Sequence, residues 1–151
     1  MTEFKRSHDK TNLTHTWIIG VDTIGAHGKK ILLKPKNRAD ARKMLLSLSG
    51  TTHYVITGLV LMNAKTGVCY STVVKTAVTF KDVKNDELER YLNSNQWVGK
   101  AGSYAIQGRA KGFVKKIDGD TSNVVGLPIP EFIELCTQAG LTDLQKRRTK
   151  K

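Results

Sequence analysis

Apolar residues along the chain are grouped in short runs whose spacing predicts several strands. Residues 17–21 are apolar without alternation and end at Asp22, which predicts a short, fully buried strand. Residues 54–62 predict a second strand, apolar on both faces, and residues 68–80 alternate apolar and polar positions as a long, half-exposed strand does. Three shorter strands are expected, at residues 103–106, 113–117 and 123–125.

Three other segments have the spacing of helices. The first carries apolar residues at i, i+3, i+4 and i+7, namely Ala41, Met44, Leu45 and Leu48. It opens at residues 35–37 and closes at Gly50, a position that favours a left-handed residue. Asn85 is expected to cap a second helix, and Pro130 to begin a third helix that Gly140 ends.

The order of these elements predicts the fold class. Residues 25–34, rich in glycine and lysine, predict a hairpin or extended loop around His27-Gly28. Strands and helices intermix without a strict βαβ rhythm, which favours an α/β domain with a mixed β-sheet flanked by helices. We assign this domain to residues 17–140, a poorly ordered or divergent N-terminus to residues 1–16 and a basic tail to residues 141–151.

The composition of the chain limits which cellular compartment and which binding partners are expected. The chain has 151 residues, with 39% hydrophobic and 25% charged residues, which is typical of one globular domain. Cys69 and Cys136 fit no metal or redox spacing, so two thiols in a reducing compartment are expected. No apolar run is long enough to cross a bilayer, and residues 1–16 lack the apolar centre of a secretory signal. We therefore expect a cytoplasmic protein without a membrane partner.

A formal net charge of +12 raises the question of nucleic acid as a partner. The charge is unevenly placed, because Lys or Arg occupies five of the last six positions. The remaining excess is scattered and lacks the aromatic platforms that hold single strands. This distribution argues against nucleic-acid binding except through the tail, and scattered positive charge also suits an enzyme that handles polyphosphates.

Two charged residues are candidates for chemistry at element ends. Asp22 follows an apolar strand, where a carboxylate could hold Mg²⁺ or accept a proton from an attacking water; the alternative is an aspartate that caps the next turn. Lys34 precedes the first helix, where free N–H groups favour phosphate; the alternative is one more surface lysine.

Residues 100–109 are the third candidate. Their two glycines, Gly102 and Gly108, allow close backbone approach to a ligand, and Gln107 offers a donor and an acceptor together, which suits the edge of a pyrimidine base. A structural glycine-rich turn is the alternative. No common phosphate-loop motif occurs in the chain. His53 follows the first helix, and a polar cap or an exposed imidazole is expected there rather than a catalytic group.

Taken together, these segments resemble the Maf family of nucleoside triphosphate pyrophosphatases. The resemblance is carried by five segments in the family's order: Ile18-Ile19-Gly20-Val21-Asp22-Thr23, Leu33-Lys34-Pro35, the helix from Ala41 with its Leu48-Ser49-Gly50 exit and His53, Lys100-Ala101-Gly102-Ser103-Tyr104-Ala105-Ile106-Gln107-Gly108, and Ser122-Asn123-Val124-Val125-Gly126-Leu127-Pro128. They span Trp17 to about Gly140.

The resemblance implies a Maf/ITPase-like fold and hydrolysis of dTTP or UTP to the monophosphate and pyrophosphate, with Mg²⁺ or Mn²⁺ as the divalent metal. It implies that Asp22 accepts a proton and binds the metal, and that Lys34 contacts phosphate. Thr23 and Gln107 would select the base, with Lys100 also in contact with the substrate. The motif around Gln107 resembles the dTTP/UTP branch rather than the branch specific for methylated GTP.

The N-terminal part of the family pattern is not matched. Nothing in residues 1–16 resembles the family's Ser-x-Ser-Pro-Arg-Arg segment, and an acidic residue and a lysine that should follow it are also absent. Leu33 replaces a loop glycine, and Gly99 replaces an aspartate. We therefore expect an N-terminally incomplete domain with uncovered apolar sheet surface, which predicts dimerisation or poor solubility. The alternative function is a catalytically inactive relative that acts as a nucleotide- or nucleic-acid-binding module, or a structural partner that completes its fold with another chain.

Overall fold

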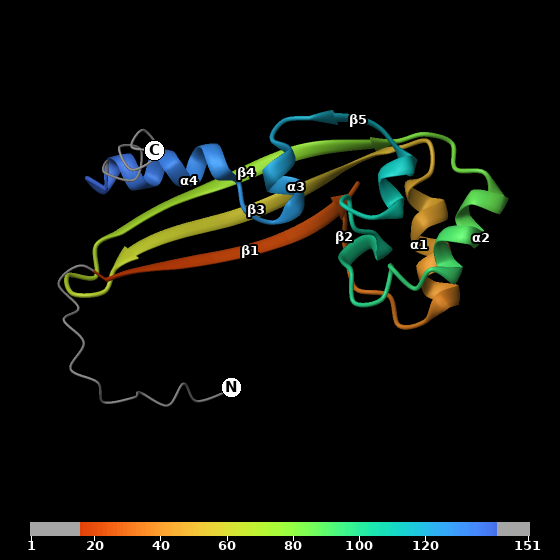
Figure 1. Ribbon diagram of the computed structural model, residues 1–151, viewed down its shortest axis with the longest axis horizontal. Helices are drawn as coiled ribbons and strands as arrows, with labels where there is room; N and C mark the ends of the chain where they lie inside the picture. The colour runs from red at the N-terminus through yellow and green to blue at the C-terminus, as the bar shows by residue number, and fades with distance from the viewer. Residues whose placement is uncertain (1–15, 142–151) are drawn as a thin grey trace, which may run out of the picture.

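The computed structural model describes residues 16–141, which form one β-sheet with helices packed on it (Figure 1). The sheet has five strands in the order β2-β1-β3-β4-β5. The strands are β1 (Trp17–His27), β2 (Lys30–Leu32), β3 (Thr52–Asn63), β4 (Cys69–Phe80) and β5 (Val114–Asp118). The helices are α1 (Arg38–Leu48), α2 (Asn85–Asn93), α3 (Thr121–Val125) and α4 (Ile129–Gln138), with 3₁₀ turns η2 (Ala101–Ser103) and η3 (Arg109–Phe113). The predicted α/β class is confirmed, whereas every strand pairing within residues 16–141 is antiparallel rather than mixed.

The first helix and the hairpin before it follow the sequence prediction. Asn37 caps α1 by accepting a hydrogen bond from the Asp40 backbone N–H at 2.9 Å. Gly50 closes the helix with φ of 68°, in the left-handed region that glycine adopts without a Cβ clash. Ahead of the helix, β1 and β2 form a hairpin that turns at Gly28.

The strand β1 differs from its prediction in length and in burial. It continues through Asp22 to His27, because ten consecutive residues pair with β3. It is also largely exposed rather than fully buried, with Ile18 48% and Ile19 50% accessible. The reason is its place in the sheet: β2 pairs only with residues 25–27, so the rest of β1 has an open edge within the described part of the chain.

The helices cover one face of the sheet. Along β3 the covered positions alternate, and His53, Val55, Thr57, Leu59 and Leu61 are buried. The opposite face carries exposed apolar side chains, those of Ile18, Ile24, Tyr54, Val60 and Val73. We call this second surface the open face; the period-2 pattern of a strand puts the two sets on opposite sides.

Two apolar clusters lie on the covered face at opposite ends of the strands. The larger one joins α1, α2 and η3 to the sheet and includes Leu45, Phe80 and Leu92. The smaller one joins α4 to β3 through Leu59, Leu61, Leu135 and Cys136. Figure 1 shows the same division, with α1 and α2 at one end of the long strands and α4 toward the other. Cys136 is buried and Cys69 is exposed, and both are free thiols as expected.

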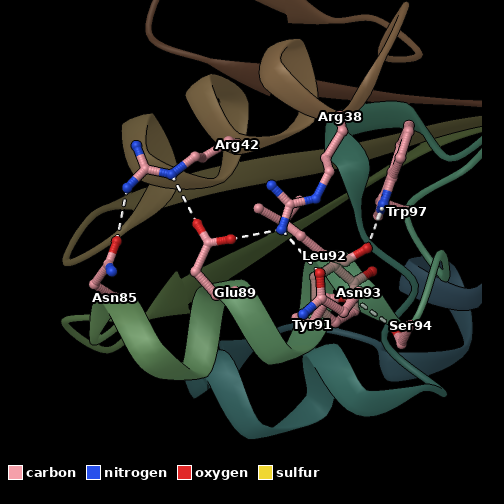
Figure 2. Close-up of polar contacts among 9 residues, drawn as sticks. All are labelled: Arg38, Arg42, Asn85, Glu89, Tyr91, Leu92, Asn93, Ser94 and Trp97. Carbon is pink, nitrogen blue, oxygen red and sulfur yellow. Dashed lines mark hydrogen bonds and ion pairs between the residues drawn. The ribbon is translucent and has the colours of Figure 1, made fainter.

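A polar network joins α1 to α2 across the larger cluster (Figure 2). Glu89 on α2 accepts hydrogen bonds from both Arg38 and Arg42 on α1, the second at 3.0 Å. Arg42 also donates to the Asn85 side chain at 2.7 Å. The predicted capping role of Asn85 is therefore wrong: it lies inside α2 and bonds to α1, while Lys84 occupies the cap position without a side-chain hydrogen bond.

Of the three short strands predicted after α2, one exists. Residues 113–117 correspond to β5, but residues 103–106 begin with the last residue of η2 and make no strand pairing. Residues 123–125 belong to α3, because Asp120 caps that helix by accepting from the backbone N–H groups of Ser122 and Asn123. A local side-chain cap thus overrides the strand preference of the valines. The last helix, α4, runs as predicted, from Ile129 to Gln138.

Between the two apolar clusters, Asn123 attaches α3 to the middle of the sheet. Its side-chain Nδ2 donates to the Val55 carbonyl at 3.2 Å and to the Thr76 hydroxyl at 3.0 Å, and it lies 3.5 Å from the Val74 carbonyl. Asn123 and Thr76 are fully buried. A buried amide with these partners is costly to remove, because the carbonyl and hydroxyl groups that it satisfies would lose their partner.

We expect Asn123→Ala to lower the free energy of unfolding by about 2–4 kcal/mol, since it removes these hydrogen bonds and leaves a cavity. Val125→Ala, on the same helix at a half-exposed position, is the matched control and should change it by less than about 1 kcal/mol. Urea denaturation measures both. Equal losses in the two variants would show that Asn123 packs as any small residue would.

Candidate functional site

A cavity of about 250 Å³ lies on the covered face beside the hairpin of β1 and β2. Its walls come from β1, β2, β3, α3 and the segment 99–107. The lining residues are Thr23, Ile24, Gly25, Leu32, His53, Val55, Gly99, Lys100, Ala101, Tyr104, Ala105, Ile106, Gln107, Val124 and Val125. We call this cavity the hairpin pocket. Its mixture of apolar walls and a few polar groups is typical of a small-molecule site.

The segment 99–107 owes its shape to contacts with its neighbours. Gly102 has φ of 66° and lies against Leu32, where an added Cβ would stand 3.2 Å from the leucine Cδ1. Its backbone N–H donates to the Leu33 carbonyl at 3.1 Å. The buried Tyr91 hydroxyl donates to the Ser103 carbonyl at 3.2 Å. The glycine predicted to permit close approach therefore permits the approach of β2 rather than of a ligand.

Three of the predicted site residues line the hairpin pocket together. Thr23 enters from β1, where its hydroxyl lies 2.9 Å from the Thr57 hydroxyl and 3.5 Å from the Gly126 carbonyl. Lys100 and Gln107 enter from the segment 99–107, and both are exposed at the pocket's rim. Residues that lie 84 positions apart in the sequence thus share one cavity, and the roles predicted for them stay predictions.

Asp22 and Lys34 lie outside the lining of this pocket. Asp22 precedes Thr23 on a strand, so its side chain emerges on the open face, beside Gly58 of β3. One carboxylate oxygen accepts from the Thr23 backbone N–H at 3.0 Å. Lys34 is exposed in the connection between β2 and α1, two residues after Leu32 of the pocket wall. The predicted proton acceptor, Asp22, and one predicted base contact, Thr23, are therefore neighbours in sequence but face opposite sides of the sheet.

His53 is a pocket residue that the sequence reasoning missed. The expectation of a polar cap or an exposed imidazole is wrong, because His53 is fully buried and lines the hairpin pocket. Its Nε2 lies 2.7 Å from the Tyr104 hydroxyl. Alternation along β3 was the signal that could have placed it, since His53 is in register with the buried positions Val55 and Thr57.

Burial sets the protonation state of this pair. Desolvation, followed by repulsion from His27, lowers the pKa of His53 to about 4, so its imidazole is neutral near pH 7. Desolvation also raises the pKa of the Tyr104 phenol above its ordinary value. Both groups are therefore uncharged hydrogen-bonding groups in the pocket wall under physiological conditions.

The described residues offer few ligands for a divalent metal. Across residues 16–141 there is no group of three or more His, Cys, Asp or Glu side chains that could enclose a metal ion. A single carboxylate such as Asp22 still fits Mg²⁺, which is commonly held by one or two carboxylates together with substrate phosphates and water. The donor set thus fits a metal that arrives with a polyphosphate. No described helix is long and apolar enough to cross a membrane.

The geometry defines an α/β domain with a small-molecule pocket of mixed polar and apolar lining. A family model described as Maf-like protein matches residues 2–139, and the chain belongs to the Maf family. It is 49% identical over 118 residues to a dTTP/UTP pyrophosphatase of Alkaliphilus metalliredigens, covering 78% of this chain and 61% of that protein. It is 42% identical over 125 residues to a dTTP/UTP pyrophosphatase of Myxococcus xanthus, covering 83% of this chain and 62% of that protein. The matched part of the chain thus spans less than two thirds of these relatives' length.

The low pKa of His53 predicts a pH-dependent stability. The unfolded histidine titrates near 6.5 and the folded one near 4, so the unfolded state binds more protons between these values. Stability should therefore be lost as the pH falls from about 6.5 to about 4, by up to roughly 3 kcal/mol. Urea denaturation across this range should show a flatter profile for His53→Gln. Parallel profiles for the two proteins would contradict burial as the cause.

Proposed function

We propose that this protein hydrolyses a pyrimidine nucleoside triphosphate of the dTTP and UTP type, releasing the monophosphate and pyrophosphate. One observation carries the proposal: Thr23, Lys100 and Gln107 converge on one pocket in a chain of the Maf family. Relatives that are named dTTP/UTP pyrophosphatases support the substrate class. Gln107 and Thr23 offer paired donors and acceptors to the edge of the base, and Lys100 offers a positive charge to the phosphates.

The position of Asp22 suggests how one nucleotide reaches both faces of the sheet. Thr23 lies in the pocket and Asp22 on the open face, and the two are consecutive residues on the unpaired part of the β1 edge. A nucleotide with its base in the pocket can extend its phosphates around this edge toward Asp22. There the carboxylate accepts the proton of an attacking water, and Lys34 offsets phosphate charge.

A divalent cation, Mg²⁺ or Mn²⁺, is part of the proposal. It would neutralise phosphate charge and orient the leaving pyrophosphate. Asp22 would supply one oxygen ligand, and the substrate phosphates would supply others. Its side chain is exposed on the open face, which leaves room for such a complex.

We also propose a cytoplasmic homodimer. The open face carries Ile18, Ile24, Val60 and Val73, between 38% and 71% exposed, and a second copy could cover them. The basic tail lies outside the described residues, and the suggestion that nucleic acid binds there stays a prediction from the sequence. Sedimentation at two concentrations tests the dimer, and a monomer at both would contradict it.

We expect Asp22→Asn to reduce pyrophosphate release from dTTP and UTP by about 10²–10⁴-fold in kcat, which is the usual effect of losing a general base. Asp118→Asn is the matched control, because this exposed carboxylate at the end of β5 does not line the pocket and, among the described residues, forms an ion pair with Lys116. The assay measures pyrophosphate from a nucleotide panel with Mg²⁺ or Mn²⁺. Equal rates for wild type and Asp22→Asn would remove Asp22 from the mechanism, and no release from any nucleotide by wild type would favour the binding-module alternative.

Chelation of divalent cations should abolish pyrophosphate release, and Mg²⁺ or Mn²⁺ should restore it, because the proposed cation offsets the phosphate charge during the reaction. The fold should survive chelation, since no metal cluster joins the described elements. Far-UV circular dichroism with and without EDTA provides the control. Release at the full rate in EDTA would contradict the metal requirement.

A further inference from the structure

Three aromatic rings pack edge-on against one another beside the hairpin pocket, and two of them, His53 and Tyr104, line it. The ring centroids of His53 and Tyr104 are 5.3 Å apart, those of His53 and Phe80 are 5.0 Å apart, and those of Phe80 and Tyr104 are 5.0 Å apart. All three pairs are close to perpendicular, which is a favourable arrangement for aromatic quadrupoles. This packing fixes the direction of the Tyr104 ring and therefore the place of its hydroxyl.

The hydrogen bond between His53 and Tyr104 has a preferred direction. The other ring nitrogen of His53, Nδ1, is buried and has no partner in the described part of the chain. If Nδ1 carried the hydrogen, a buried N–H donor would be unpaired, whereas an unpaired acceptor lone pair is better tolerated. The favoured tautomer therefore has the hydrogen on Nε2, which donates to the Tyr104 oxygen.

This tautomer leaves the Tyr104 hydroxyl hydrogen free. Within residues 16–141 the hydroxyl has no hydrogen-bond partner besides His53. Near pH 7 the imidazole is neutral and the phenol keeps its proton, so with the hydrogen on Nε2 the tyrosine oxygen accepts from His53 and its own O–H is left to donate. A ligand in the pocket that Tyr104 lines thus meets a fixed donor.

We propose that Tyr104 donates a hydrogen bond to a carbonyl oxygen of the pyrimidine base, O2 or O4, and that His53 is the positioning residue that orients this donor. The inference rests on the proposed function, since it takes the pocket's ligand to be a pyrimidine nucleotide. Gln107 at the rim and Tyr104 at the inner wall then contact different parts of the base. The carbonyl oxygens of uracil and thymine are the acceptors that a neutral hydroxyl donor recognises.

The test uses binding of uridine monophosphate and its 2-thio and 4-thio analogues, measured by isothermal titration calorimetry. Sulfur accepts hydrogen bonds poorly, so the analogue altered at the contacted position should bind wild type about tenfold more weakly than uridine monophosphate. Tyr104→Phe should bind uridine monophosphate about tenfold more weakly than wild type does. The variant should bind the same analogue as tightly as it binds uridine monophosphate. A purely structural role of Tyr104 would shift all three ligands equally, and that outcome overturns the proposal.

Two further substitutions separate donation from packing. Tyr91→Phe is the matched control, because it removes a buried hydroxyl that holds the same segment at Ser103 but does not line the pocket. It should leave the ratio between the three ligands unchanged. His53→Gln keeps a side-chain donor and should preserve the wild-type ratio of affinities for uridine monophosphate and the thio analogue. His53→Leu has no donor and should reduce this ratio toward the value for Tyr104→Phe. Equal ratios in the glutamine and leucine variants overturn the positioning role.

The binding assay is independent of turnover. If wild type discriminates among the three ligands but releases no pyrophosphate, this result contradicts the proposed hydrolysis and leaves the role of Tyr104 intact. If wild type is active but Tyr104→Phe leaves the ratios of affinity for the three ligands unchanged, this result contradicts only the inference about Tyr104. Equal binding of all three ligands by wild type, or no binding of any, also overturns that inference.

Discussion

The attachment of α3 to the centre of the sheet determines whether this helix can contribute to the wall of the hairpin pocket. Asn123 makes this attachment, because its buried amide bonds to β3 and β4 at once. The position of α3 places Val124 and Val125 in the lining of the cavity, together with the segment 99–107. Asp120 caps this helix: desolvation raises the pKa of its carboxyl group, but the hydrogen bonds it accepts from Ser122 and Asn123 together outweigh that effect and lower the pKa. A short helix of low intrinsic stability is thus held in place by buried polar contacts rather than by its own length.

The covered face of the sheet combines this polar contact with apolar packing. His53, Thr57, Thr76 and Asn123 are all fully buried on the covered face, beside the apolar clusters. His53 bonds to Tyr104 of the segment 99–107, and the other three find partners on another strand or on α3; the Nδ1 of His53 and the Oδ1 of Asn123 have no partner among the described residues. Unpaired buried atoms of this kind are uncommon in folded proteins, and the one on His53 lies in a residue of the pocket wall. The burial that makes His53 neutral is therefore the same burial that gives its hydrogen bond to Tyr104 a direction.

One-sided covering of the sheet separates two kinds of chemistry. The pocket collects Thr23, Lys100 and Gln107 on the covered face, while the carboxylate of Asp22 emerges on the open face. The open edge of β1 joins the two regions, because β2 pairs with only the last three residues of that strand. In the proposed complex the base of the nucleotide lies in the hairpin pocket and its phosphates lie on the open face. The proposed mechanism depends on this edge.

Local sequence signals determined the elements whose ends are set by their own residues. Asn37 and Gly50 bound α1, the alternation along residues 68–80 identified β4, and the residues that carry the family resemblance singled out Gln107 and Thr23. Tertiary structure decided what depends on neighbours distant in sequence. Residues 17–21 look like a buried strand but are exposed because β1 is open along one edge, and the valines after Asn123 became helical because Asp120 caps them. The prediction for His53 was wrong for the same reason. This histidine is buried because of its register in β3 and because Tyr104, 51 residues later in the chain, packs against it. Hydrophobic period and capping are properties of adjacent residues, whereas burial is a property of the assembled sheet.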